Sequence, residues 1–166
     1  MDPSFVFDKI DKIVSKAELG RKKAEYFKNV VNNLLNFEAF DEKSKLALSS
    51  SYDDVRAITT DVCNDIKNFD IETLKNFLKE DSKLNVFKSE KEDIELKCNF
   101  VLNLEDMKTF QENLDYLSKA FNIKEARFNI INKISSIADK HIDIHVNASR
   151  VFNNLKKDIE DSLKRE

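Results

Sequence analysis

The two histidines of the chain, His141 and His145, have the spacing that points most directly to chemistry. On an α-helix, side chains four residues apart share a face, which is how many two-histidine metal sites are built. No H-E-x-x-H pattern and no E-x-x-H pair accompanies them. The spacing therefore predicts that His141 is a polar residue of a helical core seam that sets its register, with His145 at the edge of the seam. A metal-binding helical enzyme or sensor using His141 and His145 is the alternative.

The residues from 141 to 146 also alternate between polar and apolar side chains. If this segment were a strand, His141, Asp143 and His145 would share one face and form a three-ligand set. Two histidines at an interface between chains would also make association sensitive to pH.

Acidic and sulfur-bearing side chains give weaker signals. Asp54, Asp61 and Asp65 fall on one side of a predicted helix and could hold a divalent ion or act as acid and base, although a solvated surface is the simpler interpretation. Cys63 and Cys98 fit no C-x-x-C spacing, which favours two reduced thiols in a cytoplasmic protein. The alternative is one disulfide, formed in an oxidising compartment.

Composition excludes several classes of protein. The 166 residues include one glycine and one proline, so neither a P-loop, a dinucleotide fingerprint nor a G-x-S-x-G elbow can be written. With no complete catalytic set, we expect no enzyme activity and no cofactor. The net charge of −3 argues against a nucleic-acid partner, and no apolar stretch is long enough for a membrane span.

The same scarcity of glycine and proline predicts a mostly α fold, a bundle of about five helices in one domain over residues 1–166. The first and last helices are expected to be long. Apolar residues three and four apart predict helices over residues 4–36, 43–69, 71–80, 104–121 and 124–164.

Residues 84–104 are ambiguous. Ile94, Leu96, Cys98 and Phe100 alternate with polar residues, which favours a strand and a small β-hairpin near residues 84–102. A helix through Ile94, Cys98 and Val101 fits the pattern less well.

The C-terminal segment carries the strongest pattern of the chain. Its apolar stripe is wider than the a/d seam of a two-stranded coiled coil, so this helix should pack against two or more others. A helix over about 124–164 would span roughly 60 Å, which suggests that it is extended, broken near His141, or shared between chains. We expect the stripe to be the interface of a self-associating protein: Ile130, Ile134, Ile137, His141, Ile144, Ala148, Val151 and Leu155.

Together these observations favour a non-catalytic protein-interaction or assembly protein, a homo-oligomer acting through helix packing. No basic stretch followed by a long apolar one opens the sequence, so a cytoplasmic location is expected.

Overall fold

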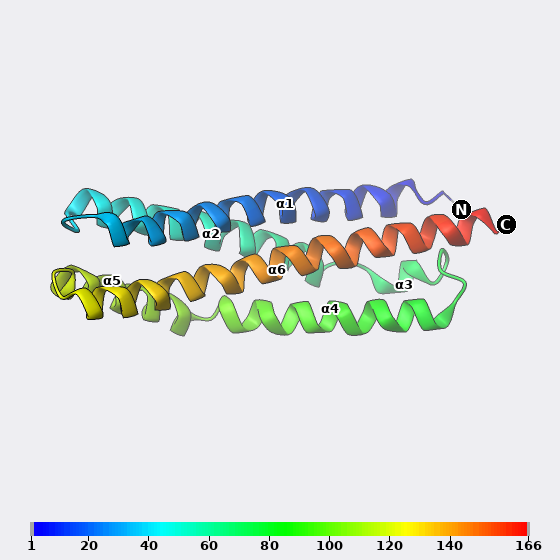
Figure 1. Ribbon diagram of the computed structural model, residues 1–166. Helices are drawn as coiled ribbons and strands as arrows, with labels where there is room; N and C mark the ends of the chain where they lie inside the picture. Colours follow the sequence, from blue (N-terminus) through cyan, green and yellow to red (C-terminus); the bar gives the residue numbers. More distant parts are fainter. Residues whose placement is uncertain (1, 166) are drawn as a thin grey trace.

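The computed structural model describes residues 2–165, and within them the chain forms six α-helices, one 3₁₀ turn and no strand (Figure 1). The expected mostly helical bundle is confirmed, with one helix more than predicted. The elements are α1 (Ser4–Asn33), the 3₁₀ turn η1 (Leu34–Asn36), α2 (Glu42–Lys67), α3 (Ile71–Leu74), α4 (Asp81–Val101), α5 (Leu104–Ala120) and α6 (Lys124–Lys164).

The helices form an elongated bundle of four columns (Figure 1). Helix α1 lies antiparallel to α6 along most of its length, and α2 packs beside α1. Helices α4 and α5 follow each other end to end and together make the fourth column, against the two halves of α6. The N- and C-termini lie at the same end of the bundle.

The 41-residue helix α6 is continuous through His141, so the strand alternative for residues 141–146 is wrong. The expected length of about 60 Å did not fit a compact globule, but the whole bundle is elongated and α6 is flanked by α1, α4 and α5 of its own chain. The third predicted helix is shorter than expected, because α3 ends at Leu74.

The expected hairpin near residues 84–102 is wrong, because α4 is helical from Asp81 to Val101. Its inward face follows the helical spacing that the weaker alternative used. The apparent alternation came from Leu96 and Phe100, which lie on the outer side of the helix and are 66% and 60% exposed. The buried residues of α4 are Leu84, Phe87, Lys91, Ile94, Cys98 and Val101.

The break between α4 and α5 is held by polar contacts. Asn103 caps α5 by accepting a hydrogen bond from the amide of Asp106 at 2.9 Å. Arg56 of α2 donates from Nη2 to the carbonyl of Leu102 at 2.8 Å, so it satisfies one of the carbonyls left free at the end of α4. The contact lies at the junction of α4 and α5 and joins it to α2.

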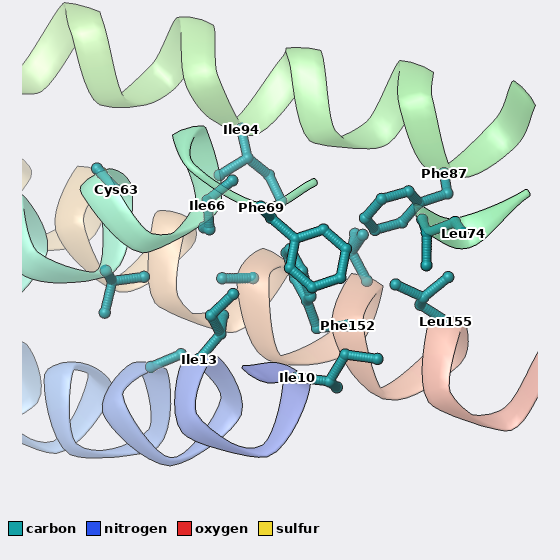
Figure 2. Packing of buried hydrophobic residues seen from close by; sticks show 14 of the residues in the cluster. Ile10, Ile13, Cys63, Ile66, Phe69, Leu74, Phe87, Ile94, Phe152 and Leu155 are labelled. Carbon is teal, nitrogen blue, oxygen red and sulfur yellow. The ribbon is translucent and has the colours of Figure 1, made fainter. Parts of the chain in front are cut away.

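Buried apolar side chains form two clusters, one in each half of the bundle. The first lies near the termini and joins α1, α2, α3, α4 and α6. The rings of Phe69, Phe87 and Phe152 contact one another, with the Phe152 centroid 5.2 Å from that of Phe69 and 5.4 Å from that of Phe87. Figure 2 shows Ile10 and Ile13 approaching this group from α1. Edge-to-face contacts of this kind add to the burial of apolar area.

The second cluster fills the opposite half, between α1, α2, α5 and α6. Tyr52 stacks on Phe110 with centroids 3.9 Å apart, and Phe27 lies at 5.9 and 6.1 Å from these two rings. No helix of residues 2–165 combines the length and apolar character that crossing a bilayer requires.

Candidate functional site

Between the two apolar clusters lies a layer of four residues that belongs to neither cluster, and we call it the central polar layer. It consists of Gly20 from α1, Thr59 from α2, and His141 and His145 from α6. The two histidines and Thr59 are at most 1% exposed. His141 lies in the core as predicted, whereas His145, expected at the edge of the core, is fully buried as well.

Thr59 joins the two rings. Its Oγ1 lies 2.8 Å from Nδ1 of His141 and 3.0 Å from Nε2 of His145. The Nδ1 atom of His145 is buried without a hydrogen-bond partner. Because an orphaned N–H is rarer in protein interiors than an orphaned acceptor, we infer that His145 carries its proton on Nε2 and donates it to Thr59. The Thr59 hydroxyl then donates to His141.

Gly20 makes room for this arrangement. A Cβ atom at position 20 would lie 2.2 Å from Cε1 of the His145 ring, far inside van der Waals contact. Helix α1 runs unbroken through Gly20, so the residue provides close approach between α1 and α6 rather than a break. The only glycine of the chain thus faces a buried histidine ring.

Burial keeps both rings neutral. Loss of solvation lowers the pKa of His141 to about 4, and a second proton on the neighbouring His145, together with the charges of Arg56 and Lys140, acts in the same direction. Loss of solvation also lowers the pKa of His145 to about 4. No carboxylate of residues 2–165 forms an ion pair with either ring, so nothing offsets this cost.

The layer does not provide a metal site of ordinary composition. Within residues 2–165 no group of three or more histidine, cysteine, aspartate or glutamate side chains converges. Asp143, the third ligand of the strand alternative, instead pairs with Lys97 at 2.7 Å. Both histidine rings are enclosed, so the arrangement offers packing and hydrogen bonding rather than a surface on which a substrate could react.

The acidic group on α2 is divided in the structure. Asp61 and Asp65 both pair with Lys16 of α1, at 3.3 and 2.9 Å, and so help to fasten α1 to α2. Asp54 does not join them and lies at the margin of a shallow hollow beside Lys22. The three carboxylates are therefore not brought together as an ion site.

Cys63 and Cys98 form a disulfide, so the expectation of two reduced thiols is wrong. The bond joins α2 to α4 across 35 residues of sequence, with the two Cα atoms 6.0 Å apart. Spacing along the chain could not reveal the pair, because it is the bundle that brings the two helices together.

The predicted interface stripe of α6 lies against the other helices of the same chain. Its side chains are buried in the two clusters and the central polar layer, except for Ile137, which is half-buried at the margin of the second cluster. The buried members are Ile130, Ile134, His141, Ile144, Ala148, Val151 and Leu155.

A different surface is both exposed and apolar. Between the outer side of α4 and α6 lies a hollow of about 280 Å³, which we call the α4–α6 groove. The amine of Lys140 lies 5.1 Å from the centroid of the Phe100 ring at one side of it. The groove is lined by Leu96, Lys97, Phe100, Val101, Lys140 and Asp143.

Two parts of these sites escaped the sequence analysis. Nothing in the sequence marks Thr59, because it lies 82 residues from His141. Leu96 and Phe100 did leave a signal, since two large apolar residues four apart fall outside the helical spacing of the inward face. In the sequence alone, that signal favours a strand.

Comparison with protein-family models, with curated proteins and with solved structures finds no match for this chain.

Proposed function

We propose that this chain is a non-catalytic protein-interaction or assembly protein that associates with another copy of itself through the α4–α6 groove. The observation that supports this most directly is the pair Leu96 and Phe100, about two-thirds exposed on adjacent turns of α4 beside an apolar hollow. Exposed apolar surface that gathers beside a hollow is typical of interaction sites. The stripe of α6 is already covered within the chain, so the proposal places the interface on the groove.

The position of these two residues strengthens the proposal. A surface helix normally presents polar side chains on the side away from its core, and α4 does not do so at Leu96 and Phe100. Departures of this kind from a local rule are expected at functional sites. Burying such a side chain against a partner contributes about 1 to 2 kcal/mol to the free energy of association. An isolated chain gains nothing from the same side chain, because it stays in contact with water.

Other surfaces support association less well. The larger hollow between α5 and α6, of about 670 Å³, has a lining rich in polar side chains such as Glu112, Asn113 and Lys133. Leu46 of α2 is as exposed as Leu96, at 68%. It lines none of the hollows described above, and single exposed apolar residues are ordinary.

The test is the solution mass across concentration, measured by size-exclusion chromatography with light scattering. The wild-type chain should rise from 19.3 kDa toward twice that mass as concentration increases. The variant Leu96→Glu/Phe100→Glu should remain monomeric, because burying a charge in an apolar interface is costly. Leu46→Glu, matched in residue type and exposure, should associate like the wild type. A wild-type chain that stays at 19.3 kDa even at about millimolar concentration, where weak dimers form, would remove the proposal.

A further inference from the structure

The outer face of α4 carries charge at both ends of its apolar pair. Asp93 lies one turn before Leu96 on the same side of the helix, and Lys140 of α6 lies over the ring of Phe100. From Asp93 to Phe100 the helix rises roughly 10 Å. An anion of α4, two large apolar side chains and a cation of α6 therefore follow one another, with the paired Lys97 and Asp143 beside them.

Both of these charges lack an ion-pair partner within the part of the chain that the structure describes. Neighbouring charges are paired: Lys97 with Asp143 at 2.7 Å, and Arg150 with Glu90 at 2.8 Å. Among the described residues, Asp93 makes no ion pair or side-chain hydrogen bond. Lys140 makes its contact with Phe100 and longer-range interactions with two groups of its own chain, Asp106 and His141. Exposed charges beside an apolar pair are available to a partner.

The order of these groups restricts how a second copy can dock. A two-fold axis perpendicular to α4 makes the partner's α4 run in the opposite direction, so the anionic end of one copy meets the cationic end of the other. A parallel arrangement would place Asp93 beside Asp93 and Lys140 beside Lys140, which is unfavourable.

We propose that the α4–α6 groove binds a second copy of this chain with the two α4 helices antiparallel about a two-fold axis. Asp93 of each copy then lies beside Lys140 of the other, and the Leu96–Phe100 pairs pack between them. This arrangement rests on the proposed self-association and specifies its geometry. A contact made mainly by one helix is at the small end of interface sizes, so the dimer should be weak and its population concentration-dependent.

The experiment reverses one charge at a time and follows dimerisation by sedimentation equilibrium. Asp93→Lys and Lys140→Glu each place like charges at both ends of the interface, and each should weaken the dimer by about tenfold or more. An equimolar mixture of the two variants should form a heterodimer. In it the lysine introduced at position 93 faces the glutamate introduced at position 140, and the native Lys140 of one variant faces the native Asp93 of the other. The double variant Asp93→Lys/Lys140→Glu should dimerise like the wild type.

Asp53→Lys is the matched control, since it makes the same change of charge at an exposed position on α2 and should leave dimerisation unchanged. If the wild type dimerises and neither single variant is weakened, the antiparallel pairing is overturned while self-association stands. Single variants that are weakened but recover neither in the mixture nor in the double variant also overturn it. A wild type that never dimerises removes this geometry together with the proposed function.

Discussion

Gly20 is the only glycine in the chain, and it lies where the ring of His145 comes closest to α1. In an exposed helix interior, replacing glycine by alanine stabilises by up to about 1 kcal/mol. Here the new Cβ would collide with Cε1 of His145, and the ring is held by Thr59 and cannot retreat freely. We predict that Gly20→Ala lowers the free energy of unfolding by about 1 to 3 kcal/mol, measured by urea denaturation.

The control for this prediction is the same substitution beside a smaller neighbour. In a His145→Ala background the clash is absent, so Gly20→Ala should become neutral or stabilising. A double-mutant cycle of this kind isolates the contact from the helix propensity of alanine. If Gly20→Ala raised the free energy of unfolding of the wild-type chain, the close approach of α1 and α6 would be disproved.

The central polar layer makes stability depend on pH. Both histidines have a pKa of about 4 in the folded chain, below the value of about 6.5 for an unperturbed histidine. The unfolded chain therefore binds more protons between these two values, and the free energy of unfolding falls as pH decreases. The contribution of the neutral rings is complete above about pH 6.5 and is lost progressively toward pH 4.

We predict that, as pH falls from 7.5 to 5, the titration of each histidine lowers the free energy of unfolding by about 2 kcal/mol. Urea denaturation at these two pH values gives the size of the effect. Replacing His141 and His145 by Asn should reduce the loss by about 4 kcal/mol, because asparagine does not titrate. An equal loss in the variant and the wild type would mean that other groups, such as carboxylates, dominate the acid response.

At the scale of single residues, sequence reasoning found the histidine pair but not its partner. The spacing of His141 and His145 was enough to place both on one face of a helix, with a core role favoured over a metal site. Thr59 could not be found, since one threonine on a long amphipathic helix carries no pattern. The structure places Gly20, the one glycine of the sequence, where α1 and α6 come close together.

At the scale of elements, the disulfide between Cys63 and Cys98 is a covalent link between α2 and α4. A cross-link that closes a loop of about 35 residues is expected to contribute about 4 kcal/mol by the chain-entropy model. We predict that reduction, or the variant Cys63→Ser/Cys98→Ser, lowers the free energy of unfolding by about 2 to 4 kcal/mol. The measurement is urea denaturation with and without a thiol reductant.

The serine variant is also the control, because reductant should leave its unfolding unchanged. If the wild type and the variant unfolded at the same urea concentration, the bond would not stabilise α4. Disulfides persist in oxidising compartments, so the bond removes the thiol-based reason for expecting a cytoplasmic location.

Helix α4 shows where element prediction failed and why. The other long helices were predicted with nearly correct bounds, because their apolar residues follow one face. In α4 the outward Leu96 and Phe100 interrupted that spacing, and Lys91, which pairs with Glu95, occupies a buried position normally apolar. Periodicity records burial inside one chain, so large apolar residues on an exposed face produce a false pattern.

At the scale of the whole molecule, the bundle is longer than its chain length suggests. A compact globule of this size has a radius of gyration of about 15 Å. A rod about 60 Å long with four helices in cross-section has a radius of gyration of about 19 Å. We predict the larger value for the monomer in small-angle X-ray scattering extrapolated to low concentration. A value near 15 Å would mean that α6 is bent or broken in solution.

The elongated shape of the bundle is the property that the sequence predicts least well. The sequence predicts a helix of 41 residues, and comparison with a compact globule suggests that such a helix is extended, broken near His141 or shared between chains. No local pattern states that α4 and α5 will stack end to end to match it. In the folded bundle Arg56 of α2 donates a hydrogen bond to the end of α4, a long-range contact that no local pattern records.

The central polar layer also divides the molecule into two blocks that could melt one at a time. The two apolar clusters share no residue. In the layer between them, the hydroxyl of Thr59 makes one hydrogen bond to His141 and one to His145. Only α1, α2 and α6 continue from one block into the other. Amide hydrogen exchange should then show two cooperative units, with different opening free energies on either side of Thr59 and His141. A bundle divided in this way can loosen at one end while the other end, and whatever is bound there, stays folded.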